Sequence, residues 1–179
     1  MWLVIVFNLP WIAHLAYGKN YNEYREGLHI IPILAMGSVF LGTYYNLSVW
    51  YKLTNKTWTG AWITIAGAVI TIVLNIWWIP LFGYTGSAWA TFICYAFMMI
   101  VSYILGQKHY LIPYAWKKLS SYIALAVVLY GVQLMLGKWI KNEWLLTGVG
   151  AVFFILYAIL ILRIEWKEFQ KIPVIGQWI

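Results

Sequence analysis

The sequence predicts an all-α protein: a polytopic bundle of about six helices that cross a membrane. The first observation is a series of long apolar stretches without any Asp, Glu, Lys or Arg, at residues 28–51, 58–82, 84–105, 119–136 and 144–162. A helix needs roughly 20 apolar residues to cross the hydrocarbon core of a bilayer. The second observation is composition. Hydrophobic residues make up 64% of the chain and charged residues only 9%, whereas soluble domains carry about 25% charged residues.

Each stretch is expected to be a helix, because lipid offers the backbone no hydrogen-bond partners. The 13 Trp and 14 Tyr support this, because many of them lie at the ends of the apolar stretches, as in an interfacial aromatic belt. These terminal aromatic residues are Trp50, Tyr51, Trp58, Trp77, Trp78, Tyr84, Trp116, Trp144 and Trp166.

In order, the spans are expected at residues 2–17, 28–51, 58–82, 84–105, 117–137 and 144–162, followed by an interfacial cytoplasmic tail at 164–179. The first is short and lacks the basic leader and cleavage site of a secretory signal. We expect it to be a helix cut at its N-terminal side, which would make this chain the back end of something larger.

The connections between spans are short, which predicts antiparallel neighbours. Residues 53–57 form a tight turn, and Gly83 with Gly86 forms another after Pro80, which is expected to end or kink its helix. Small residues recur at helical spacing, as at Gly60, Thr64 and Gly67. They indicate close helix packing within the bundle, and the single cysteine, Cys94, is expected to be a packing residue.

The basic residues predict the orientation, since loops rich in Lys and Arg stay in the cytoplasm. One set of loops carries eight: Lys52, Lys56, Lys108, Lys117, Lys118, Arg163, Lys167 and Lys171. The other set carries four: Lys19, Arg25, Lys138 and Lys141. Both termini are therefore expected in the cytoplasm. The net charge of +7 is interpreted as a topology signal, and no nucleic-acid partner is expected, because the charges are scattered.

The chain offers little catalytic chemistry. It has no Asp, and all five Glu lie in loops or the tail, so a metal-binding carboxylate pair within the membrane is excluded. A glycine-rich phosphate loop is absent too. His14, His29 and His109 match no metal-ligand spacing. We therefore expect no cofactor and no metal, and we do not expect an enzyme.

Polar residues within the spans are the remaining candidates. Asn75 stands about one turn before Pro80, in the segment Asn75-Ile76-Trp77-Trp78-Ile79-Pro80. Its amide is suited to bond a neighbouring helix or a carbonyl that Pro80 leaves free, and this structural role is favoured over contact with a substrate.

Residues 31–107 resemble the C-terminal lobe of Wzx-type polysaccharide-biosynthesis flippases, which move O-antigen and other lipid-linked oligosaccharides. Three features carry the resemblance: Ile31-Pro32-Ile33 opening a helix that runs to Asn46, the basic turn at 52–57, and Asn75 to Pro80 closing a helix. The segment Gly83-Tyr84-Thr85-Gly86-Ser87-Ala88-Trp89-Ala90-Thr91 is similar to the family's glycine-rich turn, with Ser87 and Trp89 as departures.

The resemblance implies transport of an undecaprenyl-diphosphate-linked oligosaccharide across the bacterial inner membrane. Such proteins have two lobes that rock around a central cavity. The partners implied are membrane lipids, the lipid-linked oligosaccharide and an N-terminal lobe that this chain lacks. The residues expected to face the cavity are Arg25, His29, Tyr44, Tyr45, Asn46 and Asn75. Arg25 or His29 would meet diphosphate, and the Tyr and Asn side chains would meet sugar.

Two alternatives stay open. A membrane-embedded polyprenyl-linked sugar transferase or acyltransferase would need a catalytic acid or histidine near the membrane, and the candidates are His14, His29, Glu23 and Glu26. A membrane assembly subunit with no transport of its own would need none of these side chains.

Overall fold

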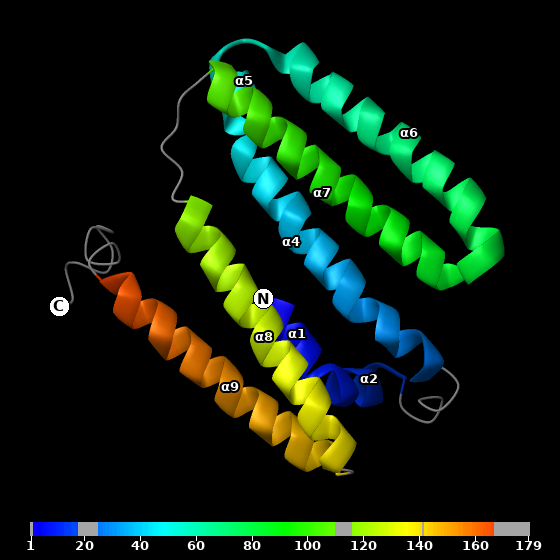
Figure 1. The fold of residues 1–179 in the computed structure, drawn as a ribbon, viewed down its shortest axis with the longest axis vertical. Coiled ribbons are helices and arrows are strands. Elements are labelled where there is room, and N and C mark those ends of the chain that lie inside the picture. Colours follow the sequence, from blue (N-terminus) through cyan, green and yellow to red (C-terminus); the bar gives the residue numbers. More distant parts are fainter. Residues whose placement is uncertain (1, 18–24, 110–115, 141, 167–179) are drawn as a thin grey trace. The chain divides into compact units, whose positions relative to one another are not determined.

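The computed structural model describes residues 2–17, 25–109, 116–140 and 142–166 (Figure 1). These residues are almost entirely helical and include no strand. Five helical segments among them are long and apolar enough to cross a membrane, namely Gly27–Leu53, Thr57–Phe82, Tyr84–Lys108, Lys118–Trp139 and Trp144–Ile164. The predicted all-α polytopic bundle is confirmed, with one such segment at each of the five charge-free stretches.

Residues 2–17 differ from the expected single span. They form two short helices, α1 (Trp2–Phe7) and α2 (Leu9–Tyr17), of 6 and 9 residues. These lengths correspond to roughly 9 and 14 Å, well short of a bilayer core. The local cause is visible at the junction. The Asn8 side chain donates to the Val4 carbonyl oxygen at 2.9 Å, and Pro10 has no N–H with which to continue the helical ladder.

The chain divides into two compact units. The central unit comprises residues 22–115, to which Trp2 is also assigned, and the terminal unit comprises Leu3–Tyr21 with Trp116–Ile179. The central unit contains all of residues 31–107. Each unit has its own helix packing.

In the central unit, α7 (Tyr84–His109) packs between α4 (Ile31–Leu47) and α6 (Thr57–Phe82) (Figure 1). Glycines permit these close approaches. A Cβ at Gly37 of α4 would lie 3.4 Å from the Tyr95 ring, and one at Gly67 of α6 would lie 2.9 Å from the Met98 sulfur. Such small residues let helix backbones approach in lipid, so the expected packing role of Gly67 is confirmed.

The central unit is completed by a 3-10 helix, η2 (Arg25–Ile30), and by the short α5 (Val49–Leu53). The expected uninterrupted helix over 28–51 is therefore broken at Ser48, where the Ser48 hydroxyl donates to the Tyr45 carbonyl oxygen at 2.6 Å. Back-bonding of this kind bends helices. The tight turn expected at 53–57 is confirmed, since α5 ends at Leu53 and α6 begins at Thr57.

A single glycine joins α6 to α7. Gly83 has φ +58°, a left-handed conformation that suits glycine, and its N–H donates to the Ile79 carbonyl oxygen at 2.8 Å. Pro80 was expected to end or kink its helix, and it does not end it, because α6 continues through it to Phe82. Pro80 costs the helix one hydrogen bond, and the bond from Gly83 still closes the last turn.

The core of the central unit lies where α4, α6 and α7 meet and consists of Tyr44, Leu47, Ile63, Cys94, Met98 and Met99. Cys94 is 5% exposed, and its thiol donates to the Gly67 carbonyl oxygen at 3.2 Å. The expected packing role of Cys94 is confirmed.

The terminal unit contains α8 (Trp116–Trp139) and α9 (Glu143–Ile164) as packed neighbours, with α2 against α9. Asn142 caps α9 by accepting from the Trp144 N–H at 3.1 Å. At the other end of the pair, the Lys118 ammonium lies 3.2 Å from the Glu165 carboxylate, to which the Tyr122 hydroxyl also donates. These two contacts therefore link the start of α8 to the end of α9. The predicted tail lies outside the described residues from 167 onward.

Candidate functional site

Of the six residues expected to face a cavity, three lie at one end of the central unit, Arg25 and His29 lie at the other, and Asn75 lies within α6. Tyr44, Tyr45 and Asn46 stand in the last turn of α4, whereas His29 precedes its first turn. Since a helix rises about 1.5 Å per residue, His29 and Tyr44 are more than roughly 20 Å apart along the axis. The structure therefore does not gather the candidates into one cluster.

The Tyr44 end is a hydrogen-bonded core. Tyr44 is 4% exposed, and its hydroxyl lies 3.3 Å from the Tyr51 hydroxyl and 3.3 Å from the Thr64 hydroxyl. The Tyr44 hydroxyl thus has one partner on α5 and one on α6, although the Tyr44 side chain itself is buried. This arrangement gives Tyr44 a role in holding the three helices together.

The two neighbours of Tyr44 in sequence behave differently. Tyr45 is 62% exposed. Asn46 is also exposed, and its side-chain amide donates to the Gly42 carbonyl oxygen in its own helix at 3.2 Å. Both are accessible on the outer face of α4, and neither is part of the buried hydroxyl group.

At the opposite end, His29 contacts the start of α7. Its Nε2 lies 3.3 Å from the Thr85 hydroxyl, and its ring centroid lies 5.8 Å from that of Tyr84. Arg25 begins the same 3-10 helix, while its side chain lies outside the described part of the structure. The His29 imidazole and the Thr85 hydroxyl therefore lie together beside the turn at Gly83 that joins α6 to α7.

An apolar hollow of about 340 Å³ opens beside this pair. Its lining residues come from the end of α6 and the start of α7, and they are Trp78, Phe82, Thr85, Gly86 and Trp89. Thr85 belongs both to the hollow and to the contact with His29. We refer to this set of five lining residues as the α6–α7 hollow.

Asn75 lies one turn before Trp78 on α6. Its side-chain oxygen is buried and has no hydrogen-bond partner among the described residues. Contacts between α6 and α7 bracket its position, with Cys94 bonded to Gly67 on one side and Gly86 placed against the Trp78 carbonyl on the other. An unpaired buried acceptor costs free energy, so the Asn75 oxygen is a polar group that the described residues leave unsatisfied.

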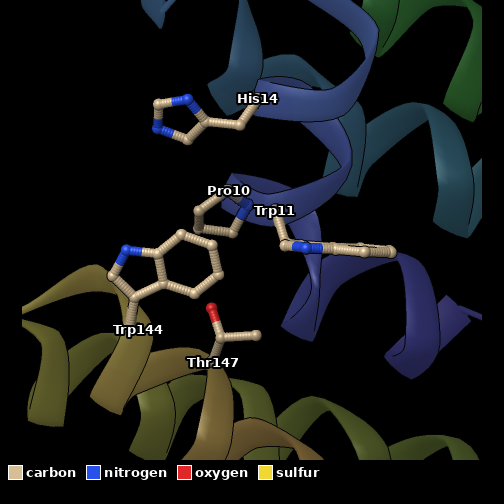
Figure 2. A pocket seen from close by; sticks show the side chains of 5 residues that line it. All are labelled: Pro10, Trp11, His14, Trp144 and Thr147. Atoms are coloured by element: carbon tan, nitrogen blue, oxygen red, sulfur yellow. The ribbon is translucent and has the colours of Figure 1, made fainter.

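The terminal unit has a smaller hollow, lined by Pro10, Trp11, His14, Trp144 and Thr147. Figure 2 shows Trp144 and Thr147 of α9 directed toward Pro10 of α2, with His14 one turn further along α2. The space measures about 10 Å³, room for roughly one water molecule. It is too small for a sugar or a lipid chain.

The described residues include no group of three or more His, Cys, Asp or Glu side chains that would hold a metal ion. Of the four residues named for a membrane enzyme, His14 and His29 stand in separate units. Glu23 and the side chain of Glu26 lie outside the description. Among the described residues, the end of the central unit with the α6–α7 hollow and His29 combines space with polar groups.

Sequence reasoning selected His29 for this site and missed Thr85, Trp78 and Trp89 as its neighbours. A signal was present, because Thr85 and Trp89 lie in the glycine-rich segment 83–91 and Trp78 in the aromatic belt. What the sequence lacked was the pairing of residue 29 with residue 85, which depends on how the helices fold back. Comparisons of the chain with protein-family models, curated proteins and solved structures gave no match.

Proposed function

We propose that this chain is the C-terminal part of a lipid-linked oligosaccharide flippase that works by alternating access in the bacterial inner membrane. In this proposal the central unit forms one wall of the substrate path, and a separate N-terminal lobe forms the other. The substrate is a polyprenyl-diphosphate-linked oligosaccharide for surface polysaccharide assembly.

The main support for the proposal is that the motifs that carry the resemblance fall at helix ends within one compact unit. The flippase-like residues, 31–107, fall within a single compact unit whose helix ends coincide with the motifs. The glycine-rich segment forms the joint between α6 and α7 at Gly83, and the basic segment 52–57 forms the turn into α6. A resemblance carried by scattered residues would not follow the boundaries of packed helices in this way.

The distribution of polar groups also supports a carrier. Hydroxyl, amide and imidazole groups occur at both ends of the central unit, at Tyr45 and Asn46 and at His29 and Thr85. These groups are suited to reversible hydrogen bonds with sugars and phosphates.

Charge supports a cytoplasmic position for one end of the central unit. Lys52 stands in the last turn of α5, Lys56 precedes α6 and Lys108 stands in the last turn of α7, so three separate helix ends bring basic residues to the same end. By the positive-inside rule this end faces the cytoplasm. The α6–α7 hollow and His29 then lie at the periplasmic end.

Complementation of a flippase-null bacterial strain tests the function. The chain is expressed with and without an N-terminal lobe supplied as a separate polypeptide, and surface polysaccharide is measured. Restoration only when both are present supports the proposal. Absence of polysaccharide with both, while the chain is detected in the membrane fraction, contradicts it.

A further inference from the structure

The exposed face of α4 consists mostly of polar or small residues. At about 100° per residue, the exposed positions of this helix fall within an arc of roughly 120°, so they form one continuous face. Only the first of them has an aliphatic side chain. We refer to these five residues as the outer face of α4, and they are Leu34, Ser38, Gly42, Tyr45 and Asn46.

This face reaches well below the membrane surface. Lys52, whose ammonium has to stay near water, follows Asn46 by six residues and Gly42 by ten. These separations correspond to roughly 9 and 15 Å of helix, so Gly42 lies near the middle of a hydrocarbon core about 30 Å thick. The Asn46 amide donates to the Gly42 carbonyl oxygen at 3.2 Å, and such an amide has a second N–H and an acceptor oxygen besides. In contact with lipid those groups would cost free energy.

The exposed face of α6 has the opposite character. Trp58 and Trp77 are 75% and 71% exposed, and the 19 residues from one to the other correspond to roughly 28 Å of helix. That length is close to the thickness of the hydrocarbon core. The exposed residues between them are apolar apart from Thr64, whose hydroxyl donates to the Gly60 carbonyl oxygen at 2.9 Å. This face therefore suits lipid, with its two tryptophans at the two interfaces.

The two faces belong to one compact unit in which α7 packs between α4 and α6 (Figure 1). We propose that this unit turns the outer face of α4 toward a water-filled substrate path and the exposed face of α6 toward the bilayer. In this arrangement Tyr45 and Asn46 contact the saccharide of the transported molecule. The inference rests on the proposed flippase function for the identity of the ligand, whereas the orientation rests on the two faces themselves.

The chemistry of the two contact residues suits a sugar. The Tyr45 side chain is 62% exposed, and a tyrosine combines an apolar ring, which can lie against the C–H face of a sugar, with a polar hydroxyl. The Asn46 amide offers both a donor and an acceptor to sugar hydroxyls. The Ser38 hydroxyl donates to the Leu34 carbonyl oxygen in its own helix at 3.0 Å, so we assign it no contact with the saccharide.

Gly42→Cys and Val69→Cys, each in a Cys94→Ala background, test the orientation. The two positions are matched in depth, because Gly42 stands 11 residues before the end of α5 at Leu53 and Val69 stands 12 residues after the start of α6 at Thr57. Both variants are expected to fold. A Cβ at Gly42 meets nothing within 4 Å, and Val69 is 54% exposed.

Each variant is expressed with the N-terminal lobe in the flippase-null strain, and the opened cells are treated with a small, charged, water-soluble thiol reagent. Such a reagent reacts with the thiolate, which forms in contact with water. Gly42→Cys is therefore expected to be labelled about tenfold faster than Val69→Cys. Equal rates, or faster labelling of Val69→Cys, would overturn the orientation even where surface polysaccharide is restored. Faster labelling of Gly42→Cys without restored polysaccharide would support the orientation and contradict the flippase function.

Asn46→Leu tests the contact with the saccharide. It is expected to lower surface polysaccharide about tenfold at equal amounts of protein in the membrane, which corresponds to the loss of one hydrogen-bonding group. Ile72→Leu is the control, because Ile72 is 59% exposed on α6. In the purified complex with the N-terminal lobe, the lipid-linked oligosaccharide is expected to slow labelling of Gly42→Cys more than the polyprenyl diphosphate without sugar. Equal slowing by the two lipids, or full polysaccharide in Asn46→Leu, would overturn the contact.

Discussion

The hydroxyl of Tyr44 lies 3.3 Å from the hydroxyl of Thr64, and this contact joins α4 directly to α6 although α7 packs between the two helices. The same Tyr44 hydroxyl meets that of Tyr51 on α5. Because Tyr44 is nearly inaccessible, at 4% exposure, its hydroxyl has no water to replace these partners. The contact therefore stabilises the basic end of the central unit.

Replacing Tyr44 by Phe is expected to destabilise the protein by about 1 kcal/mol, the net value of a typical buried hydrogen-bond group. The ring stays in place, so the loss is that of the hydroxyl alone. Unfolding in detergent, followed by helical circular dichroism, measures the change. Tyr45→Phe is the control and is expected to have little effect, because Tyr45 is 62% exposed. Equal effects of the two changes would contradict this role.

Gly60 faces the ring of Tyr51, and a Cβ at this position would lie 2.7 Å from two of its ring carbons. Gly60→Ala is therefore expected to destabilise the central unit by about 1–3 kcal/mol, as in other overpacked contacts. In α9, a Cβ at Gly148 would meet nothing within 4 Å, so Gly148→Ala should be neutral or stabilising through helix propensity. The same unfolding assay compares them, and a similar loss in both would rule out the packing explanation.

In the terminal unit, the Tyr122 hydroxyl donates to the Glu165 carboxylate, and with the Lys118 ammonium it holds the pKa of Glu165 below its usual value. Glu165 follows the last residue of α9 and so lies outside the spans. A lowered carboxyl pKa means stability that is present above the ordinary pKa of Glu, about 4.3, and is lost as pH falls through the folded pKa.

Unfolding measured between pH 7 and pH 3 is expected to show this loss in the unaltered chain, as a fall in stability that begins below the ordinary pKa of Glu. Glu165→Gln is expected to lose the pH-dependent part contributed by this carboxyl. The control is Lys108→Gln, a change at a cation of the central unit, which should leave the acid limb unchanged. An identical pH profile for Glu165→Gln would show that the contacts of Glu165 with Tyr122 and Lys118 do not contribute to stability.

The sequence alone was sufficient to predict features that depend on residues close together in the chain. The five long spans follow from uninterrupted apolar length, and the turn at Gly83 follows from glycine beside a proline-containing helix end. The break at Asn8 is also local, but composition alone predicted a continuous span there. Apolar length does not register competition between the Asn8 amide and the helical ladder.

The candidate site depended on distant pairings that no local pattern encodes. His29 and Thr85 are 56 positions apart, and they meet because α4 and α7 pack with this register. Tyr44 was expected in a cavity because its hydroxyl is polar, but Tyr51 and Thr64 satisfy that hydroxyl inside the core. Which polar residues in a span pair with one another is decided by helix order and rotation.

Asn75 connects fold with proposed function, because its buried oxygen has no partner among the described residues. In this chain alone, Asn75→Leu is expected to be neutral or stabilising, since it removes an unpaired polar group. When an N-terminal lobe is supplied, the same change is expected to reduce complementation if the proposed flippase uses the Asn75 amide, and unchanged complementation would show that it does not. Ser38→Ala is the control, as the Ser38 hydroxyl bonds within its own helix. A marked loss of stability in the chain alone would contradict this interpretation.

The orientation of the helices is open to a direct measurement, because the chain has a single cysteine and Cys94 is buried. In a Cys94→Ala background, a membrane-impermeant thiol reagent is applied to intact cells. Lys138→Cys, at the end of α8, is expected to react, whereas Lys56→Cys, before α6, is expected to react only after the cells are opened. The reason is that Lys56 lies with Lys52 and Lys108 at the basic end of the central unit, which the positive-inside rule assigns to the cytoplasm. Reaction of Lys56→Cys in intact cells would reverse the topology and move the α6–α7 hollow to the cytoplasmic side.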